Sequence, residues 1–251
     1  MIRILFILIL TFILHLSMTA QTMVDFETGV IVPGYNDVRI PGDQGTLFSL
    51  KDDLKPKSKM FYRFRLSYTI NSRHTISLLY APLETKSEGI VDNDILFEGE
   101  LFQANNQLNG AYKFNSYRLT YRYDIVYKPK IIFGFGLTAK IRDAAIRISS
   151  TNLKAEKTNV GFVPIINFRL LWKFKEDFGL LLDGDALAAP QGRAEDVQIA
   201  LTYTLSNKIN IRAGYRILEG GADNDEVYNF ALFNYASVGI SYTFNGKSTS
   251  K

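Results

Sequence analysis

Strict alternation of polar and apolar side chains runs through most of this chain and restricts it to β-structure. Between Tyr117 and Ile125, every odd-numbered residue is tyrosine, leucine or isoleucine, and the even-numbered ones are arginine, threonine or aspartate. Successive side chains of a strand point to opposite faces, so the stretch has one apolar and one polar face. A helix would need a repeat of about 3.6 residues, and such segments are nearly absent. The pattern therefore predicts an all-β fold.

Ten segments share this period and are rich in the Tyr, Phe, Ile and Thr that suit pleated sheets. The predicted strands are 23–32, 60–70, 75–83, 113–127, 131–147, 160–174, 178–186, 196–205, 208–218 and 230–244. Tight polar turns alternate with longer connections, of which the longest are 33–59 and 84–112. An antiparallel up-and-down meander has this form, and outer-membrane barrels place short turns at one end and long loops at the other. Within the first long loop, residues 47–54 could form a short helix.

The first twenty residues have the order of a secretory signal peptide. Arg3 precedes an apolar run over 4–16, and small residues lead to Ala20, where we expect cleavage. The run is shorter than the roughly 18–20 residues that span a bilayer as a helix, although an uncleaved anchor is the alternative. We expect no transmembrane helix elsewhere. The sequence predicts three parts: a signal peptide (1–20), one domain (21–244) and a short periplasmic tail (245–251).

Composition fits an exported protein of one domain. The chain has 251 residues and no cysteine, so it must fold without disulfides. Its net charge of +4 would fall to +3 on loss of Arg3, which is too weakly basic to indicate nucleic-acid binding.

Two observations favour a barrel with its polar face inside and its apolar face toward lipid. In the segment 131–147, the polar face mixes Lys140 and Arg142 with Gly134 and Gly136, as a narrow barrel interior requires. Aromatic residues also stand at many ends of the apolar faces, like the girdles of outer-membrane barrels. They are Tyr62, Tyr68, Tyr117, Tyr123, Tyr127, Trp172, Tyr203, Tyr242 and Phe244. A soluble sandwich or lipocalin-like barrel, with the faces reversed, is the alternative.

Over residues 23–244 the chain resembles bacterial outer-membrane β-barrel proteins of the small, single-chain kind, such as the OmpA-barrel and OmpW-like groups. The resemblance rests most on the closing segment 236–244, which is similar to the terminal aromatic signal read by the barrel-assembly machinery. This segment ends at Phe244. In the family the phenylalanine at this place is usually the last residue of the chain, whereas here residues 245–251 follow it. The resemblance implies a monomer in the bacterial outer membrane, surrounded by lipid and lipopolysaccharide and holding no cofactor.

The polar faces predict a network of charged side chains in the lumen. Its predicted members are Arg63, Arg65, Arg118, Arg122, Asp124, Lys140, Arg142, Arg169, Asp183, Asp185 and Arg212, with Asp25, Glu27 and Arg216 as further candidates. Buried charges must be paired, so we interpret the acids as partners of the arginines. Asp183 and Asp185, two apart on one strand, could alternatively act as a general acid and base.

The sequence offers no other catalytic group. His74 is the one histidine after the signal peptide and lies beside a tight turn. Known enzymes on such barrels are proteases, phospholipases and lipid A deacylases. The resemblance implies that these enzymes place a histidine near the outer rim or in the membrane-facing wall. We therefore predict a protein without a catalytic site.

An acidic segment could take a divalent cation. Glu219, Asp223, Asp225 and Glu226 offer hard oxygen ligands, but their spacing does not match a calcium-binding template. A solvated loop is the simpler interpretation, and ion-bridged contact with lipopolysaccharide is a further possibility. We predict no metal site.

The expected function is non-enzymatic: a structural barrel, or a narrow passive channel for small solutes. One alternative is a surface-binding protein that uses the loops 33–59 and 84–112. Another is a hydrolase that uses Asp183 and Asp185.

Overall fold

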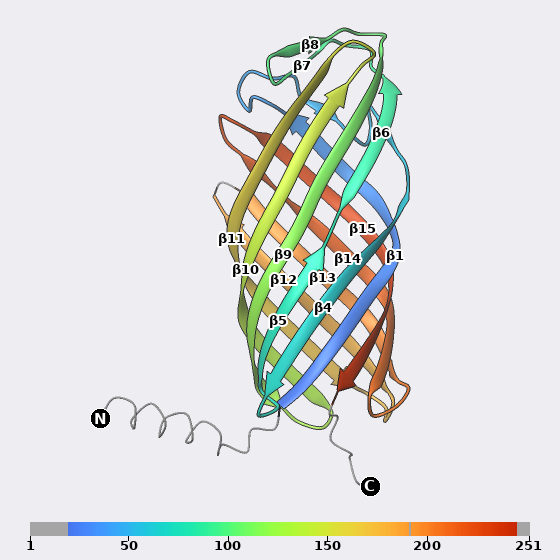
Figure 1. Cartoon of the computed structure of the whole chain (residues 1–251), viewed down its shortest axis with the longest axis vertical. Helices are drawn as coiled ribbons and strands as arrows, with labels where there is room; N and C mark the ends of the chain where they lie inside the picture. Colours follow the sequence, from blue (N-terminus) through green and yellow to red (C-terminus); the bar gives the residue numbers. More distant parts are fainter. Residues whose placement is uncertain (1–19, 191, 245–251) are drawn as a thin grey trace, which may run out of the picture.

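Ten antiparallel strands form a closed barrel wall in the computed structural model, which describes residues 20–190 and 192–244 (Figure 1). The wall is built from β1 (Ala20–Arg39), β4 (Lys59–Ile70), β5 (His74–Ala81) continued by β6 (Glu84–Ile90), β9 (Gln107–Tyr127), β10 (Ile131–Ser149), β11 (Lys154–Lys173), β12 (Phe178–Ala189), β13 (Gly192–Thr204), β14 (Ile209–Asp223) and β15 (Tyr228–Phe244). Almost all of the predicted signal peptide and the whole predicted tail lie outside the described residues. Among the described residues, no helix is long and apolar enough to cross a membrane.

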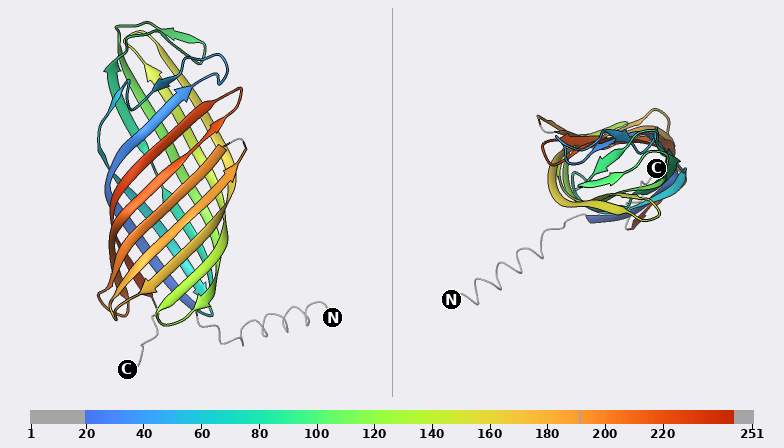
Figure 2. Two further views of the ribbon diagram at one scale, coloured as in Figure 1. Left: turned by 180° about the vertical axis from the view of Figure 1, so that it is seen from behind. Right: turned by 90° about the horizontal axis from the view of Figure 1, so that it is seen from above.

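The wall closes where the last strand pairs with the first. Along this seam Thr22 is opposite Phe244 at one end, and Arg39 is opposite Tyr228 at the other. All the remaining wall strands pair with the next wall strand along the chain, so the sheet has no free edge within the membrane. Closure satisfies the backbone hydrogen-bonding groups that lipid cannot. The predicted up-and-down barrel of ten strands is confirmed (Figure 2).

One wall strand is interrupted. β5 and β6 both pair with β9 and are separated by Pro82 and Leu83. Proline has no N–H to offer to a ladder, which breaks the pairing here. The Leu83 N–H instead donates to the side-chain oxygen of Asn115, at 3.2 Å. The interruption therefore leaves this backbone group satisfied.

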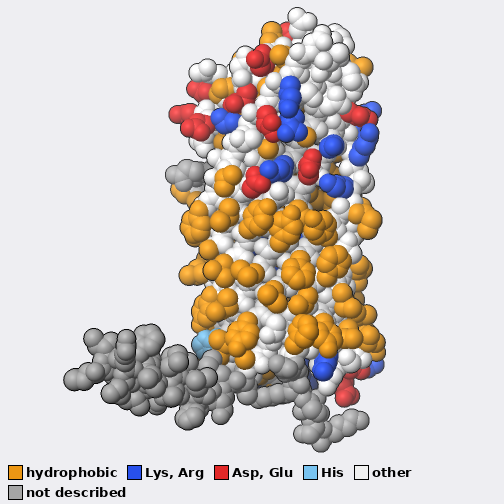
Figure 3. Space-filling model, viewed as in Figure 1, with side chains coloured by type: hydrophobic (Ala, Val, Ile, Leu, Met, Phe, Trp, Pro, Cys, Tyr) orange, Lys and Arg blue, Asp and Glu red, His pale blue; other side chains and the backbone are white. Residues whose placement is uncertain are grey.

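A belt of apolar side chains crosses the face of the barrel seen in Figure 3, and every wall strand contributes exposed apolar residues to it. The odd-numbered residues of β9 from Tyr117 to Tyr127 all point outward, and Leu119 among them is 50% exposed. At about 3.3 Å per residue and a tilt of about 40°, this stretch has a height of about 25 Å, which is the height of the apolar band of outer-membrane barrels. Charged side chains gather above the belt (Figure 3). The predicted orientation, with the apolar face outward, is confirmed.

The strands continue past the belt on the side away from the tight turns, which we call the outer end. β1 runs to Arg39, β9 begins at Gln107 and β11 begins at Lys154. The connections at this end are consequently shorter than predicted. Four small strands lie there: β2 (Phe48–Ser49), β3 (Lys55–Pro56), β7 (Ile95–Phe97) and β8 (Glu100–Phe102).

The predicted helix over 47–54 is wrong. Phe48 instead pairs with Val38 of β1, and turns follow it. The N–H groups of Asp53 and Leu54 both donate to the carbonyl of Ser49, at 3.2 Å. Because β1 extends beyond the membrane, it offers Phe48 a strand partner that local sequence could not reveal.

The belt predicts a stability difference between two positions on one face of one strand. Leu119→Arg places a charge in mid-belt and should lower the free energy of unfolding by about 2–4 kcal/mol. Asn109→Arg, ten residues along the outer face of β9 and above the belt, should change it by less than about 0.5 kcal/mol. Denaturant titration of protein folded into lipid bilayers measures both values. Equal effects would mean that the belt is not the lipid-facing surface.

Candidate functional site

The lumen contains a layer of charged side chains at the level of the belt. At this level inward positions share one parity along each strand, so arginines and acids of opposite walls meet in the lumen. Asp196 of β13 is 2% exposed and accepts hydrogen bonds from three arginines. The distances are 2.9 Å to Arg63 of β4, 2.5 Å to Arg118 of β9 and 2.5 Å to Arg216 of β14. One carboxylate thus connects four strands across the lumen.

Further ion pairs extend this layer in both directions. Glu27 of β1 binds Arg216 at 2.8 Å and Arg212 at 2.9 Å, and Arg212 also pairs with Asp25. The other pairs are Arg65–Asp183 (2.9 Å), Arg118–Asp185 (2.5 Å) and Arg122–Asp124 (3.0 Å). Hydrogen bonds to charged partners are shorter and stronger than neutral ones, so the layer is rigidly cross-linked.

Three cations of this layer form no ion pair within the part of the chain that is described. The Lys140 ammonium lies 4.7 Å from the ring centroid of Phe114, a favourable cation–π contact. Arg142 donates to the side-chain oxygen of Asn159. Arg169 of β11 makes neither kind of contact and borders a cavity at the periplasmic end. The layer therefore contains more positive than negative charge.

Glycines make room for this layer. A Cβ on Gly239 would lie 2.5 Å from the Arg212 guanidinium carbon, and one on Gly134 would lie 2.3 Å from an Asp124 carboxylate oxygen. The alternation of small and charged residues on the polar faces, noted in the sequence, thus has a direct steric cause.

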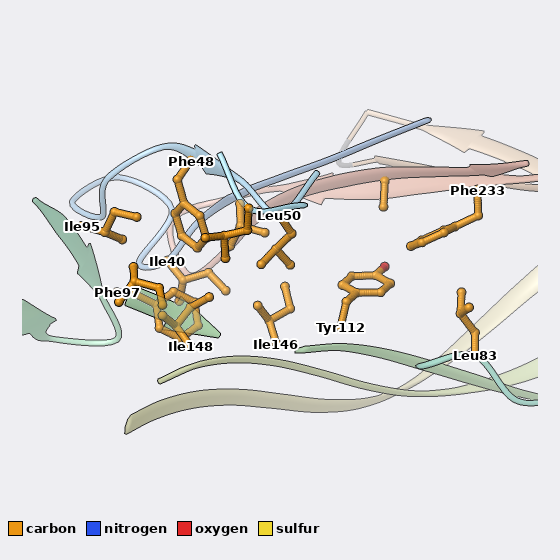
Figure 4. Packing of buried hydrophobic residues seen from close by; sticks show 14 of the residues in the cluster. Ile40, Phe48, Leu50, Leu83, Ile95, Phe97, Tyr112, Ile146, Ile148 and Phe233 are labelled. Carbon is orange, nitrogen blue, oxygen red and sulfur yellow. The ribbon is translucent and has the colours of Figure 1, made fainter. Parts of the chain in front are cut away.

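Above the charged layer the lumen becomes apolar (Figure 4). Wall residues such as Ile148, Phe233 and Tyr112 point inward and pack against residues of the outer connections, including Phe48 and Phe97. We call this cluster the cap core. Its buried members are Ile31, Val38, Ile40, Phe48, Leu50, Leu54, Phe61, Leu83, Val91, Ile95, Phe97, Phe102, Leu108, Tyr112, Ile146, Ile148, Ala155, Leu218, Ala231, Phe233 and Tyr235.

The four acids of the predicted cation site are not brought together. Glu219 lies in β14 and accepts hydrogen bonds from the Arg193 guanidinium, at 2.7–2.9 Å, and from the Tyr35 hydroxyl. Burial alone would raise the pKa of the Glu219 carboxyl, but these two donors outweigh burial and hold that pKa below its ordinary value. Asp223 ends β14, and the other two acids lie in the turn after it. No group of three or more possible metal ligands occurs among the described residues.

The structure places every predicted member of the charge network on the lumenal side of the wall. The sequence reasoning missed Asp196, the acid with the most arginine partners. Asp196 is the first residue of the predicted strand 196–205 and has the same parity as Thr202 and Thr204, the polar side of that strand, so the signal was present in the sequence.

The acids and the histidine do not form a catalytic arrangement. Asp183 and Asp185 each accept a hydrogen bond from an arginine, and Asp185 also accepts from the Thr138 hydroxyl at 2.7 Å. His74 instead contacts the Tyr121 hydroxyl, at 2.9 Å, among the aromatic residues of the outer face. His74, the candidate general base, and the two lumenal acids therefore lie on opposite faces of the barrel wall.

Comparison with known proteins supports the architecture. No family model and no curated protein matches the chain. Among solved structures, the outer membrane protease OmpT of Escherichia coli is similar with a TM-score of 0.54 at 11% identity, covering 91% of this chain and 99% of OmpT. The chain is an outer-membrane β-barrel. The closed wall and the apolar belt place this barrel in the bacterial outer membrane.

Two further solved structures share the barrel form at lower similarity. Ail, the attachment invasion locus protein of Yersinia pestis, has a TM-score of 0.40 at 12% identity, covering 89% of this barrel's chain and 99% of Ail. An outer membrane channel of Pseudomonas putida F1 has a TM-score of 0.42 at 8% identity, covering 90% and 95% of the two chains. At 11% identity, the likeness to OmpT defines the fold and no activity.

The charged layer predicts that Asp196 is critical for stability. Asp196→Asn leaves three guanidinium groups short of one negative charge and should cost about 3–5 kcal/mol of unfolding free energy. Glu156→Gln is the matched control, because it removes one carboxylate from the partly exposed pair with Arg147 and should cost less than about 1 kcal/mol. Unfolding in bilayers measures both. A small loss for Asp196→Asn would show that the layer is well hydrated.

Proposed function

We propose that this barrel is a non-enzymatic, structural protein of the outer membrane that is closed at rest and holds a folded cap at the cell surface. The cap core is the observation that carries the proposal. Outer-membrane lipid and lipopolysaccharide as surroundings, delivery by the barrel-assembly machinery and a monomeric state belong to the same proposal.

Closure follows from the contents of the lumen. Phe97 and Leu54 of the outer connections are fully buried against wall residues such as Leu108 and Ile148. An ion or polar solute that entered this cluster would lose its hydration without gaining hydrogen bonds, at a cost of several kcal/mol. The ion pairs below it also bridge opposite walls. Of the two expected functions, the cap core therefore favours the structural one over passive passage.

The non-enzymatic part of the proposal rests on the state of the acids. A general base must have a free lone pair within reach of its substrate. Asp183 and Asp185 each pair with an arginine, which stabilises the carboxylate against taking up a proton. One Asp183 oxygen has no hydrogen-bond partner among the described residues, but His74 lies outside the lumen and cannot act together with it. Hydrolysis of lipid or peptide by the purified protein that Asp183→Asn abolishes would overturn this part of the proposal.

Conductance tests closure directly. In planar bilayers the protein should show no steady current, or only small and rare steps. A large, steady conductance would rule out a closed lumen.

A pair of variants in the β7–β8 hairpin tests whether the cap core keeps the lumen closed. Phe97→Glu puts a charge into the core and should destabilise the cap, giving conductance steps and faster proteolysis of the outer connections. Leu101→Glu, in the same hairpin but 52% exposed, should do neither. If Phe97→Glu leaves conductance at the level of the unchanged protein, closure depends on the charged layer alone.

Binding of a surface partner is the second candidate function. The observation that favours it is the exposure of three apolar side chains beyond the belt: Leu47 (56%), Ile90 (60%) and Leu101 (52%). A photo-crosslinking residue at Leu101 in intact cells tests it, with the same residue at Lys208 in a periplasmic turn as control. A single, saturable adduct at position 101 alone would support binding, and its absence would favour the structural role.

A further inference from the structure

The periplasmic half of the lumen contains a cavity of about 310 Å³. It extends from exposed turn residues such as Asp177 and Asn207 to the charged layer, so it communicates with solvent at the periplasmic end. Hydroxyl groups from β13 and β15, including Thr202 and Ser241, line its walls. We call this cavity the vestibule. Its volume is at the lower end of the range for small-molecule sites, about 300–1,000 Å³.

Cations and acids alternate around the inner end of the vestibule. Arg65 is held by Asp183, and Arg212 is held by Asp25. Arg169 is directly opposite Asp183 in the strand register, yet this acid binds Arg65 instead. Arg169 consequently lines the vestibule without an ion pair or side-chain hydrogen bond among the described residues.

The charged groups nearer the mouth of the vestibule are one lysine and two acids. Lys173 lines the wall, and Glu176 and Asp177 lie in the exposed turn after it. Both acids are solvated, and screening in water weakens their effect on a group deep in the vestibule.

The balance of charge over the whole layer gives Arg169 its significance. Nine cations face six carboxylates: Arg63, Arg65, Arg118, Arg122, Lys140, Arg142, Arg169, Arg212 and Arg216 against Asp25, Glu27, Asp124, Asp183, Asp185 and Asp196. A charge removed from bulk water needs a counter-charge. Lys140 has an aromatic ring and Arg142 has an amide oxygen, whereas Arg169 faces a solvent-connected cavity.

We propose that the vestibule is a binding site for a small periplasmic oxyanion, a phosphate or carboxylate group seated on the Arg169 guanidinium. The planar fork of arginine matches two oxygens of such a group, which a halide cannot offer. Hydroxyls of Thr202 and Ser241 line the same cavity and are available as donors. The site is independent of the proposed closure, since it opens to the periplasm and lies at the periplasmic edge of the charged layer, on the side away from the cap core.

Titration calorimetry of the folded, full-length protein in detergent tests the site. Inorganic phosphate, acetate and chloride are added separately at pH 7 and equal ionic strength. Phosphate, acetate or both should bind saturably at one site, whereas chloride should not compete. The stronger of the two oxyanions identifies the chemical class. Absence of saturable binding by both, or equal competition by chloride, would overturn the proposal.

Variants then locate the anion. Arg169→Gln should weaken binding at least tenfold, and Arg169→Lys, which retains the charge without the fork, should weaken it less. Arg142→Gln is the matched control, because it removes the same charge from the lumen but outside the vestibule and should leave affinity within about twofold. Equal losses for Arg169→Gln and Arg142→Gln would show a general effect of lumenal charge and no site. If Arg169→Gln does not fold, as judged by heat-dependent gel mobility, unchanged affinity in Arg169→Lys would exclude a role for the fork.

Discussion

The bonds between Asp196 and three arginines are the interaction on which the interior depends. The bonds to Arg63 and Arg118 connect β13 to β4 and β9 across the lumen, and the bond to Arg216 joins β13 to the adjacent β14, so together they define how the walls face each other. Desolvating so many charges gives little net stability, because attraction in a buried pair roughly offsets the loss of hydration. We infer that the layer instead specifies one geometry, because a displaced wall would leave guanidinium groups without partners. The cap core and the vestibule occupy the space that this layer leaves on either side.

The barrel reverses its polarity along its own strands. On β9 the apolar residues point outward at the membrane, as Leu119 does, and inward above it, as Tyr112 does. β10 changes in the same way between Leu137 and Ile148. Lipid solvates apolar surface in the first region, whereas water in the second forces it into the lumen. A single continuous sheet thus builds a membrane wall and a water-soluble core without a domain boundary.

This reversal explains what the sequence could reveal. Alternation predicted the ten strands, because the two faces of a membrane strand are distinct. The glycines on the polar faces and the aromatic residues at the ends of the apolar faces then predicted that the apolar face points outward and the arginines point into the lumen. The cap was mistaken for loops, although Ile146 and Ile148 share the parity of Lys140 and already indicated an inward apolar surface. The choice of Arg65 over Arg169 as the partner of Asp183 depends on strand stagger and side-chain reach across the barrel, which no local pattern contains. The β2 strand likewise required the extension of β1.

The pairing of Thr22 with Phe244 has a consequence for the order of assembly. Residues from the two ends of the chain must meet before the interior is sealed, and such long-range contacts form slowly. Until the seam closes, the lumenal arginines and acids remain in contact with water, where each is individually soluble. Sealing therefore removes most of the layer from bulk water in one late step. The partners must already be matched at that moment, and the growing sheet must stay open to solvent until β15 arrives.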